Sequence, residues 1–168
     1  MTDPYQPPNS TLTTDEAAGE HPLASRWARL AAVLVDGIIA ALLTVPFFMV
    51  TGMWSDMTSG AEPSYGFTLL SGLYGFVAYV VVHYYFLNQN GQTVGKKALG
   101  IRIENLEGRL IGAPNIIGKR YLPVTAASLV PIIGGLLVII DALFIFRKDR
   151  RCVHDMIAGT RVVKAPAS

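Results

Sequence analysis

The chain has 168 residues, of which 51% are hydrophobic and 15% are charged. Soluble domains carry about 25% charged residues, and the apolar residues here collect into blocks of the length that a bilayer requires, which excludes an ordinary soluble domain. The net charge is only +2, and the basic residues flank the apolar blocks, which argues against a nucleic-acid-binding face. Because Cys152 is the single cysteine, an intrachain disulfide and a cysteine metal cluster are excluded.

Residues 1–24 form a segment rich in Pro, Thr, Ser and acids, without Lys or Arg. This composition offers almost nothing to bury, so it predicts a disordered tail. The head is acidic and the first apolar run is longer than a signal-peptide core, so no cleavable signal is expected. Residues 25–164 are predicted to form one transmembrane domain.

Three apolar blocks follow, at about residues 30–53, 67–87 and 114–146. Trp27 and Trp54 bracket the first block, as tryptophans do at the two faces of a bilayer. The third block contains the cluster Pro131-Ile-Ile-Gly-Gly135, which can break a helix into two pieces.

The polar segment between the second and third blocks carries a strand pattern. Apolar and charged residues alternate over 101–104, a turn follows at 105–108, and 109–111 has the pattern of a return strand. The segment 160–163 has a similar pattern and is a candidate third strand. We therefore expect a small β-hairpin on the cytoplasmic side.

Lys and Arg mark the cytoplasmic side of short loops. They lie before the first block and between the second and third, whereas the first loop carries only acids. A single third span would leave the basic run 147–151 outside, and a hairpin bent at 131–135 removes that conflict. The expected fold is an all-α membrane protein with three hydrophobic segments, the third a broken or re-entrant helical hairpin, although a single third span stays open. Both termini are then cytoplasmic.

Each apolar block contains or adjoins a strongly polar residue. Arg29 and Asp36 are seven residues apart and share one helix face. Asp36, His83 and Asp141 lie at similar depth in the inner half of the bilayer, which predicts a shared polar cluster, whereas Arg29 can extend to the headgroups. The cluster is either a proton or cation pathway, since intramembrane acids are costly, or a polar pin for helix packing.

These residues resemble the RDD family of bacterial membrane proteins, named for one arginine and two aspartates. Arg29 and Asp36 are similar to the first pair, and the second aspartate is either Asp141 or Asp155. Two further segments resemble the family, with these matching residues: Gly91, Gln92, Thr93, Gly95, Lys96, Gly100, His154, Asp155, Gly159 and Thr160. The resemblance covers roughly residues 25–164 and implies a membrane fold, with transport of an unidentified ligand or cation/proton antiport proposed for some members.

Two motifs invite an enzymatic interpretation that their details oppose. Residues 91–97 resemble a phosphate-binding loop, but only three residues separate the glycines and Lys97 stands where Ser or Thr is needed. Lysines facing anionic lipid explain that turn better. His154 and Asp155 lack a third group to orient them, so a turn cap or an ion pair with Arg150 or Arg151 is favoured over catalysis.

We therefore expect no enzyme, no cofactor and no metal site. The leading hypothesis is a small transporter or cation/proton exchanger in the bacterial plasma membrane, using Arg29, Asp36, Asp141 and His83. The alternative is an accessory or assembly subunit of a larger membrane complex. In either case the expected partners are the lipid bilayer and a second copy or another membrane protein, because so few helices enclose little space.

Overall fold

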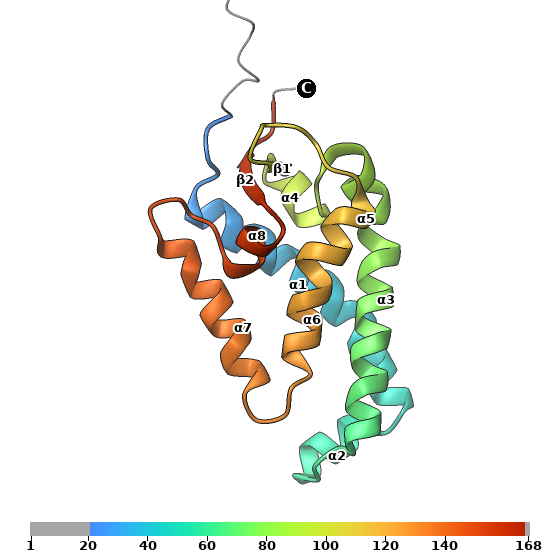
Figure 1. Ribbon diagram of the computed structural model, residues 1–168. Coiled ribbons are helices and arrows are strands. Elements are labelled where there is room, and N and C mark those ends of the chain that lie inside the picture. The colour runs from blue at the N-terminus through green and yellow to red at the C-terminus, as the bar shows by residue number, and fades with distance from the viewer. Residues whose placement is uncertain (1–20, 167–168) are drawn as a thin grey trace, which may run out of the picture.

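The computed structural model describes residues 21–166 (Figure 1). It is mostly helical and has one antiparallel sheet of two strands in the described part of the chain. The helices are α1 (Arg26–Val50), α2 (Met53–Ser59), α3 (Tyr65–Asn90), α4 (Val94–Ala98), α5 (Ala113–Ile116), α6 (Leu122–Ser128), α7 (Gly134–Leu143) and α8 (Val153–Ile157). The strands are β1 (Ile101–Asn105) and β2 (Thr160–Lys164), a π-helical turn η1 (Ile117–Tyr121) joins α5 to α6, and a 3₁₀ turn η2 (Phe144–Phe146) ends α7.

The helices α1 and α3 are long and apolar enough to cross a bilayer. At 1.5 Å per residue each is about 38 Å long, against about 30 Å of hydrocarbon. Both begin at a serine cap, where the hydroxyls of Ser25 and Ser64 accept from backbone N–H groups three residues on. Their large apolar side chains face outward along the whole length: Leu42 is 70% exposed and Val81 is 74% exposed. A lipid environment accounts for such a surface, which a soluble monomer rarely presents.

The third apolar block folds back on itself. The chain runs through α5, η1 and α6, turns at residues 129–133, and returns as α7 beside α6 (Figure 1). The turn is tight, since a Cβ on Gly134 would lie 2.5 Å from the Ser128 carbonyl oxygen. The π-helical turn η1 ends just before Pro123, whose ring and missing N–H disturb the preceding turn of a regular helix.

The sheet differs from the expected hairpin. β1 pairs with β2, with Ile101 opposite Lys164 and Asn105 opposite Thr160. The return segment 109–111 makes one backbone bond, from Asn105 N–H to the Arg109 carbonyl, and then leaves for α5. The prediction of a local hairpin was therefore wrong, because β2 brings two buried valines to β1, whereas the return segment starts with an exposed arginine.

Residues 22–24 also join this sheet. Leu23 bridges Val163, the Ala24 N–H donates to the Val162 carbonyl, and the Lys164 N–H donates to the Pro22 carbonyl. The folded part therefore begins before residue 25, within the segment that composition assigns to the tail. The expected disorder of residues 1–20 lies outside the described residues.

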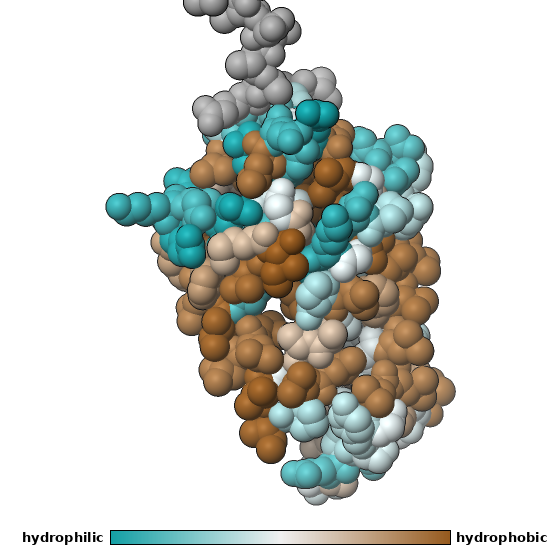
Figure 2. Space-filling model, viewed as in Figure 1, coloured by the Kyte–Doolittle hydropathy of each residue, from teal (hydrophilic) through white to brown (hydrophobic). Residues whose placement is uncertain are grey.

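The best-packed core lies at one end of the molecule. We call this end the polar cap, defined as α4, β1, α8 and β2 with the loops 91–112 and 147–166. Its core residues are buried and come from the cap and the adjoining helix ends: Ala24, Ala32, Leu87, Ile101, Ile103, Ala113, Ile116 and Val162. Figure 2 shows hydrophilic residues gathered over the cap, a largely hydrophobic band over the helices below it, and hydrophilic residues again at the far end around α2. The fold therefore places a polar, tightly packed cap on an apolar helical part.

Candidate functional site

Inside the cap, one polar cluster joins the start of α1 to the C-terminal helix α8. The Asp155 carboxylate is fully buried and lies between two guanidinium groups. Arg29 Nη2 donates to Asp155 Oδ2 at 2.6 Å, and Arg120 Nη1 donates to Asp155 Oδ1. We call Arg29, Arg120 and Asp155 the arginine clamp. It connects the first turn of α1, the π-helical turn η1 and α8.

Local structure holds the clamp in place. The Asp155 carboxylate also accepts from the Cys152 backbone N–H at 3.0 Å and so caps α8. Arg29 Nη1 donates to the Arg150 carbonyl, and Arg120 Nη1 also donates to the Thr160 hydroxyl at 3.1 Å. The predicted turn cap at Asp155 is confirmed, but its side-chain ion pairs are with Arg29 and Arg120.

The electrostatics of the clamp favour an ionised Asp155. Burial alone would raise the pKa of its carboxyl group, but the charges of Arg120 and Arg29 outweigh that effect and hold the pKa far below its usual range. Burial raises the pKa of the neighbouring Cys152 thiol to about 11, despite the charge of Arg29. The cysteine is therefore a buried, protonated neighbour of the clamp, without the low pKa of a reactive thiol.

Asp141 attaches α7 to α8 through His154. Its Oδ1 accepts from the His154 backbone N–H at 2.8 Å, and its Oδ2 lies 2.6 Å from His154 Nδ1. Burial, together with the charge of Arg120, lowers the pKa of the imidazole against the attraction of the carboxylates. His154 Nε2 lies 3.7 Å from Asp155 Oδ1, so the Asp141–His154 pair borders the arginine clamp.

Asp36 lies in a second polar cluster with different partners. Its Oδ2 accepts from the Thr93 hydroxyl at 2.6 Å, and its Oδ1 accepts from the Gly95 N–H at 2.7 Å. His83 Nε2 lies 3.8 Å from Asp36 Oδ1, while His83 Nδ1 accepts from the Val94 N–H at 3.3 Å. Because Nδ1 is an acceptor, the imidazole proton is on Nε2 and faces Asp36. We call Asp36, His83 and Thr93 the Asp36 cluster.

The family-like loop 91–100 builds the Asp36 cluster. Gly91 has φ +64° where α3 ends, and a Cβ there would lie 2.4 Å from the Ile103 carbonyl oxygen. Gln92 is buried and donates to the Ile101 carbonyl at 2.9 Å. A Cβ on Gly95 would lie 2.2 Å from the Ala32 carbonyl oxygen, so only glycine lets α4 lie this close to α1.

The two lysines of this loop point to different surroundings. Lys96 is buried, and its Nζ lies 3.4 Å from the Tyr121 hydroxyl and 3.5 Å from the Thr93 hydroxyl. Lys97 is exposed, with its Nζ 4.3 Å from the centroid of the Phe86 ring. Only Lys97 therefore remains available to face lipid.

The predicted site residues fall into these two clusters. Arg29 turns into the cap and is 6% exposed, so the expectation that it extends to the headgroups was wrong. Asp36 and His83 are brought together as expected. Asp141 instead pairs with His154, and no hydrogen bond connects it to Asp36 in the described part of the chain. The remaining motif residues, Gly100 and Gly159, have positive φ and support turns beside the strands.

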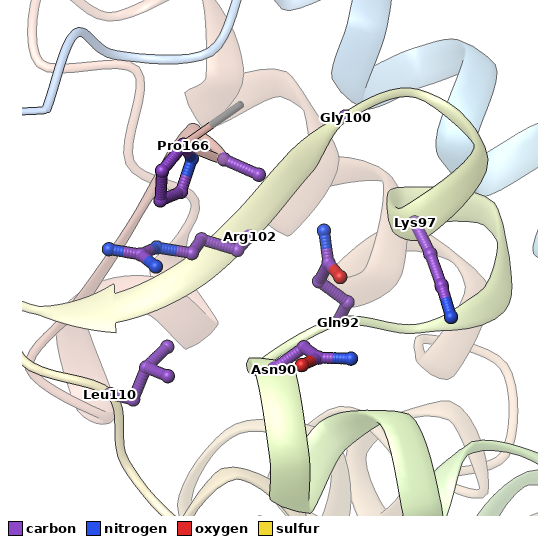
Figure 3. A pocket seen from close by; sticks show the side chains of 8 residues that line it. Asn90, Gln92, Lys97, Gly100, Arg102, Leu110 and Pro166 are labelled. Carbon is purple, nitrogen blue, oxygen red and sulfur yellow. The ribbon is translucent and has the colours of Figure 1, made fainter. Parts of the chain in front are cut away.

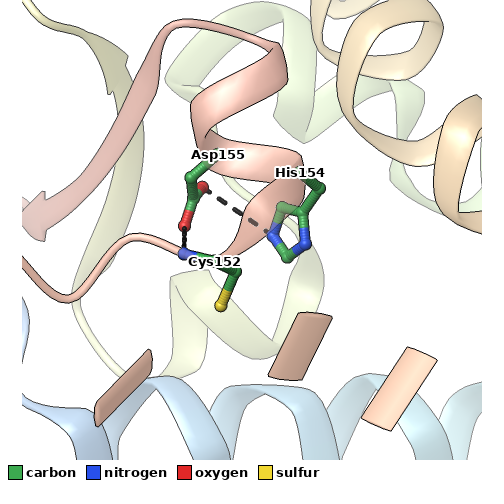
Figure 4. Close-up of side chains that lie close together, drawn as sticks. All are labelled: Cys152, His154 and Asp155. Atoms are coloured by element: carbon green, nitrogen blue, oxygen red, sulfur yellow. Dashed lines mark hydrogen bonds and ion pairs between the residues drawn. The ribbon is translucent and has the colours of Figure 1, made fainter. Parts of the chain in front are cut away.

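Cys152, His154 and Asp155 place three possible metal-ligand atoms within 4.8 Å of one another (Figure 4). Their surroundings do not suit a cation. Two arginines already bind Asp155, and Arg29 Nη2 lies 3.5 Å from the Cys152 sulfur. A divalent ion would have to displace these charges, so the cluster gives no reason to assign a metal.

Comparison with known proteins identifies the chain. The family model described as the RDD family matches residues 23–159. The chain belongs to the RDD family. Its membership and the two long apolar helices together point to a membrane protein.

Similar RDD-type sequences occur in distant bacteria. An uncharacterized protein of Haemophilus influenzae is 27% identical over 146 residues, covering 84% of this chain and 78% of the relative. The uncharacterized Bacillus subtilis protein YckC is 32% identical, covering 83% of each chain. Bacillus subtilis YxaI, also uncharacterized, is 25% identical and covers 82% of this chain and 94% of its own. No solved structure matches.

Sequence reasoning missed two participants in the buried polar network. Arg120 was counted only among the basic residues that mark the cytoplasmic side, but it is buried and pairs with Asp155, whereas the adjacent Lys119 is exposed. Glu104 was predicted only as part of the alternating strand pattern, but it is fully buried and its carboxylate accepts from Arg161 Nε at 3.0 Å and Arg102 Nη2 at 3.5 Å. The long-range pairing of β1 with β2 is what buries it.

Proposed function

We propose that this RDD protein is a small proton-coupled cation exchanger of the bacterial plasma membrane, with Asp36 and His83 as the exchanging pair. The observation that carries the proposal is the contrast between two aspartates. Two arginines fix the charge of Asp155, whereas the direct partners of Asp36 are a hydroxyl, a backbone N–H and an imidazole. Asp36 has no arginine partner among the described residues, and Lys96 adjoins the cluster through the Thr93 hydroxyl, 3.5 Å from its Nζ. Asp36 is therefore the acid that we assign to neutralisation by a proton or a small cation.

Its position makes neutralisation favourable. Asp36 lies ten residues into α1, about 15 Å from the helix start by rise. A charged side chain at the centre of a bilayer costs about 2.5–3.5 kcal/mol on insertion scales, and the hydrogen bonds to Asp36 offset part of such a cost. The Asp36 carboxylate and the Thr93 hydroxyl present oxygen atoms to a cation, and His83 Nε2 presents a proton to the same carboxylate. Proton and cation thus compete for one negative charge.

A cavity within the helical part reaches His83. It measures about 50 Å³ and lies between α1 and α3, with Thr44, Tyr79 and His83 among its lining residues. A water needs roughly 10–15 Å³ of such space and a few polar partners, so the cavity is large enough for ordered water. This space supports a route toward His83 from the side opposite the polar cap.

We also propose that the third apolar block enters the bilayer as a re-entrant hairpin. The two arms, residues 113–128 (α5 to α6) and 134–146 (α7 and η2), are about 24 and 20 Å long by helical rise, which falls short of about 30 Å of hydrocarbon. The turn between them includes Ile132, which is fully exposed with φ +68°. Irregular backbone at membrane depth needs protein or water around it, so we propose that a second copy covers this turn.

We also propose that the polar cap and both termini are cytoplasmic. The cap carries most of the basic residues, whereas the opposite end, around α2, carries Asp56 and Glu62. A reporter fused after Ser168 tests this orientation. Activity of a reporter that works only outside the membrane would contradict both the orientation and the re-entrant hairpin.

The exchange itself is tested in liposomes with an internal pH dye and an imposed pH gradient. Wild-type protein is expected to give proton flux that depends on an added monovalent cation, and Asp36→Asn to abolish it. The matched control Asp56→Asn removes an acid at the far end of the molecule and is expected to retain the flux. Equal flux in wild type and Asp36→Asn would contradict the assignment of the site.

The second candidate is an accessory subunit, favoured by the uncovered turn and by the outward-facing apolar residues of α7. In that case the purified protein is inert in liposomes under every cation gradient, and Asp36→Asn changes only its folding or its assembly with a partner. If liposomes that contain the wild-type protein show no cation-dependent proton flux, the accessory subunit becomes the favoured function.

A further inference from the structure

An open cavity on the polar cap has no part in either buried cluster. It measures about 470 Å³ and lies where the end of α3 meets α4, β1 and residues 165–166 (Figure 3). Its lining includes the side chains of Asn90, Gln92, Lys97, Arg102, Leu110 and Pro166. None of its described lining residues is acidic, so a negatively charged ligand meets no like charge there.

The cavity has a surplus of positive charge. Arg102 and Arg161 both bind the single carboxylate of Glu104, so one of the two guanidinium charges is left without a carboxylate. Lys97 Nζ has no carboxylate within ion-pair distance among the described residues and adds a second charge.

Several hydrogen-bond donors at the cavity are unused. Arg102 Nε is buried and has no partner in the described structure. The Asn90 side chain is half-buried and makes no hydrogen bond to the described residues, whereas the Gln92 amide already donates to the Ile101 carbonyl. An anion in the cavity would offer acceptor oxygens to the Asn90 amide and to the Arg102 guanidinium.

The cavity lies at the depth of lipid headgroups. Asn90 is the last residue of the membrane-crossing helix α3. One turn earlier, Tyr84 and Tyr85 are exposed, as aromatic residues are at a bilayer interface. The Lys97 ammonium lies over the Phe86 ring at this level, with its charge beyond the end of the apolar surface.

We propose that this cavity binds the phosphate headgroup of an anionic phospholipid. Lys97 and Arg102 neutralise the phosphate, the Asn90 amide donates to its oxygens, and Leu110 contacts the glycerol backbone. A phosphate on a soluble metabolite has the same chemistry, but the position at the end of α3 favours the lipid. The site is independent of the exchange at Asp36, because it shares no residue with that cluster.

The test uses the full chain in detergent and native mass spectrometry of retained phosphatidylglycerol, with phosphatidylcholine as the zwitterionic comparison. Lys97→Gln is expected to reduce phosphatidylglycerol retention about fivefold, since one basic residue near an anionic headgroup contributes about that factor. Lys97→Arg is expected to restore it. Lys119→Gln removes an equal charge from an exposed residue outside the cavity and is expected to change retention less than twofold.

Three results would overturn the proposal. Equal losses in Lys97→Gln and Lys119→Gln would show a general charge effect without a site. Equal retention of the two lipids by the wild type would remove the requirement for an anion. Displacement of phosphatidylglycerol by glycerol phosphate would assign the cavity to a soluble phosphate compound. Lys97 is exposed and forms no ion pair with the described residues, so we expect its replacement by Gln to leave the fold intact.

Discussion

Replacing Arg29 with lysine tests the arginine clamp directly. Arginine reaches Asp155 Oδ2 and the Arg150 carbonyl with two different nitrogens, and its side chain is 7% exposed. Lysine keeps the charge but has one nitrogen, so it cannot hold both acceptors. Losing one charge-assisted hydrogen bond in a buried site costs about 1.5–3 kcal/mol, and we expect Arg29→Lys to destabilise the clamp by about 2 kcal/mol.

Cys152 supplies a local assay for this change. It is the single cysteine, it is buried, and its sulfur lies 3.5 Å from Arg29 Nη2. Where labelling requires local opening, its rate follows the opening free energy. A cost of about 2 kcal/mol therefore predicts roughly thirtyfold faster labelling by a maleimide, at tenfold per 1.4 kcal/mol. Rates measured on the unfolded chains normalise the intrinsic reactivity of the thiol.

The control is Arg109→Lys, which alters an exposed arginine paired with Glu107. Exposed pairs contribute between about 0 and 1 kcal/mol, and this one is remote from the thiol, so the labelling rate should stay at the wild-type value. A labelling rate for Arg29→Lys within twofold of wild type would refute the reasoning. It would mean that lysine reaches the buried carboxylate and that the second arm of the guanidinium contributes nothing.

Two further predictions concern the same polar groups. Because the pKa of Asp155 is lower in the folded protein than the unfolded value of about 3.9, its stabilisation is complete above about pH 4 and is lost as the pH falls toward the folded pKa. Unfolding in detergent at descending pH should show this loss in wild type and lack it in Asp155→Asn, and identical profiles would contradict it. Gly95→Ala should destabilise the protein by about 1–3 kcal/mol in thermal unfolding, because its Cβ would meet the Ala32 carbonyl oxygen at 2.2 Å. Gly75→Ala, whose Cβ would meet nothing within 4 Å, is the matched control and should be neutral or slightly stabilising, so equal losses would exclude the contact as the cause.

The long apolar helices could be predicted because their cause is local. Residues 30–53 and 67–87 are mostly apolar and contain no acidic, basic or histidine side chain other than Asp36 and His83, and a bilayer allows such segments only as helices. The structure moves the first helix to 26–50 and extends the second to 65–90, because serine caps set both starts and Gly91 ends α3. The helix break at 131–135 could also be predicted, since proline and glycine change the local backbone conformation regardless of tertiary contacts.

The pairing of the polar residues was decided by tertiary structure. Sequence spacing grouped Arg29 with Asp36 on one helix face and Asp36 with Asp141 by depth. The fold instead joins Arg29 to Asp155, 126 residues away, and Asp36 to Thr93, 57 residues away. A buried charge needs a partner within hydrogen-bond distance, and the packing of the whole chain decides which residue that is. The spacing of residues along the sequence does not show it.

The sequence by itself thus determined which segments are apolar, where helices start and break, and which residues carry charge. Only the tertiary structure decided that β1 pairs with β2, that Glu104 is buried, and that a π-helical turn directs Arg120 to Asp155. The physical reason is how far apart along the chain the interacting residues lie. Hydrophobic periodicity and capping act over a few residues, whereas strand pairing and ion pairing join residues far apart along the chain and depend on how every element between them packs.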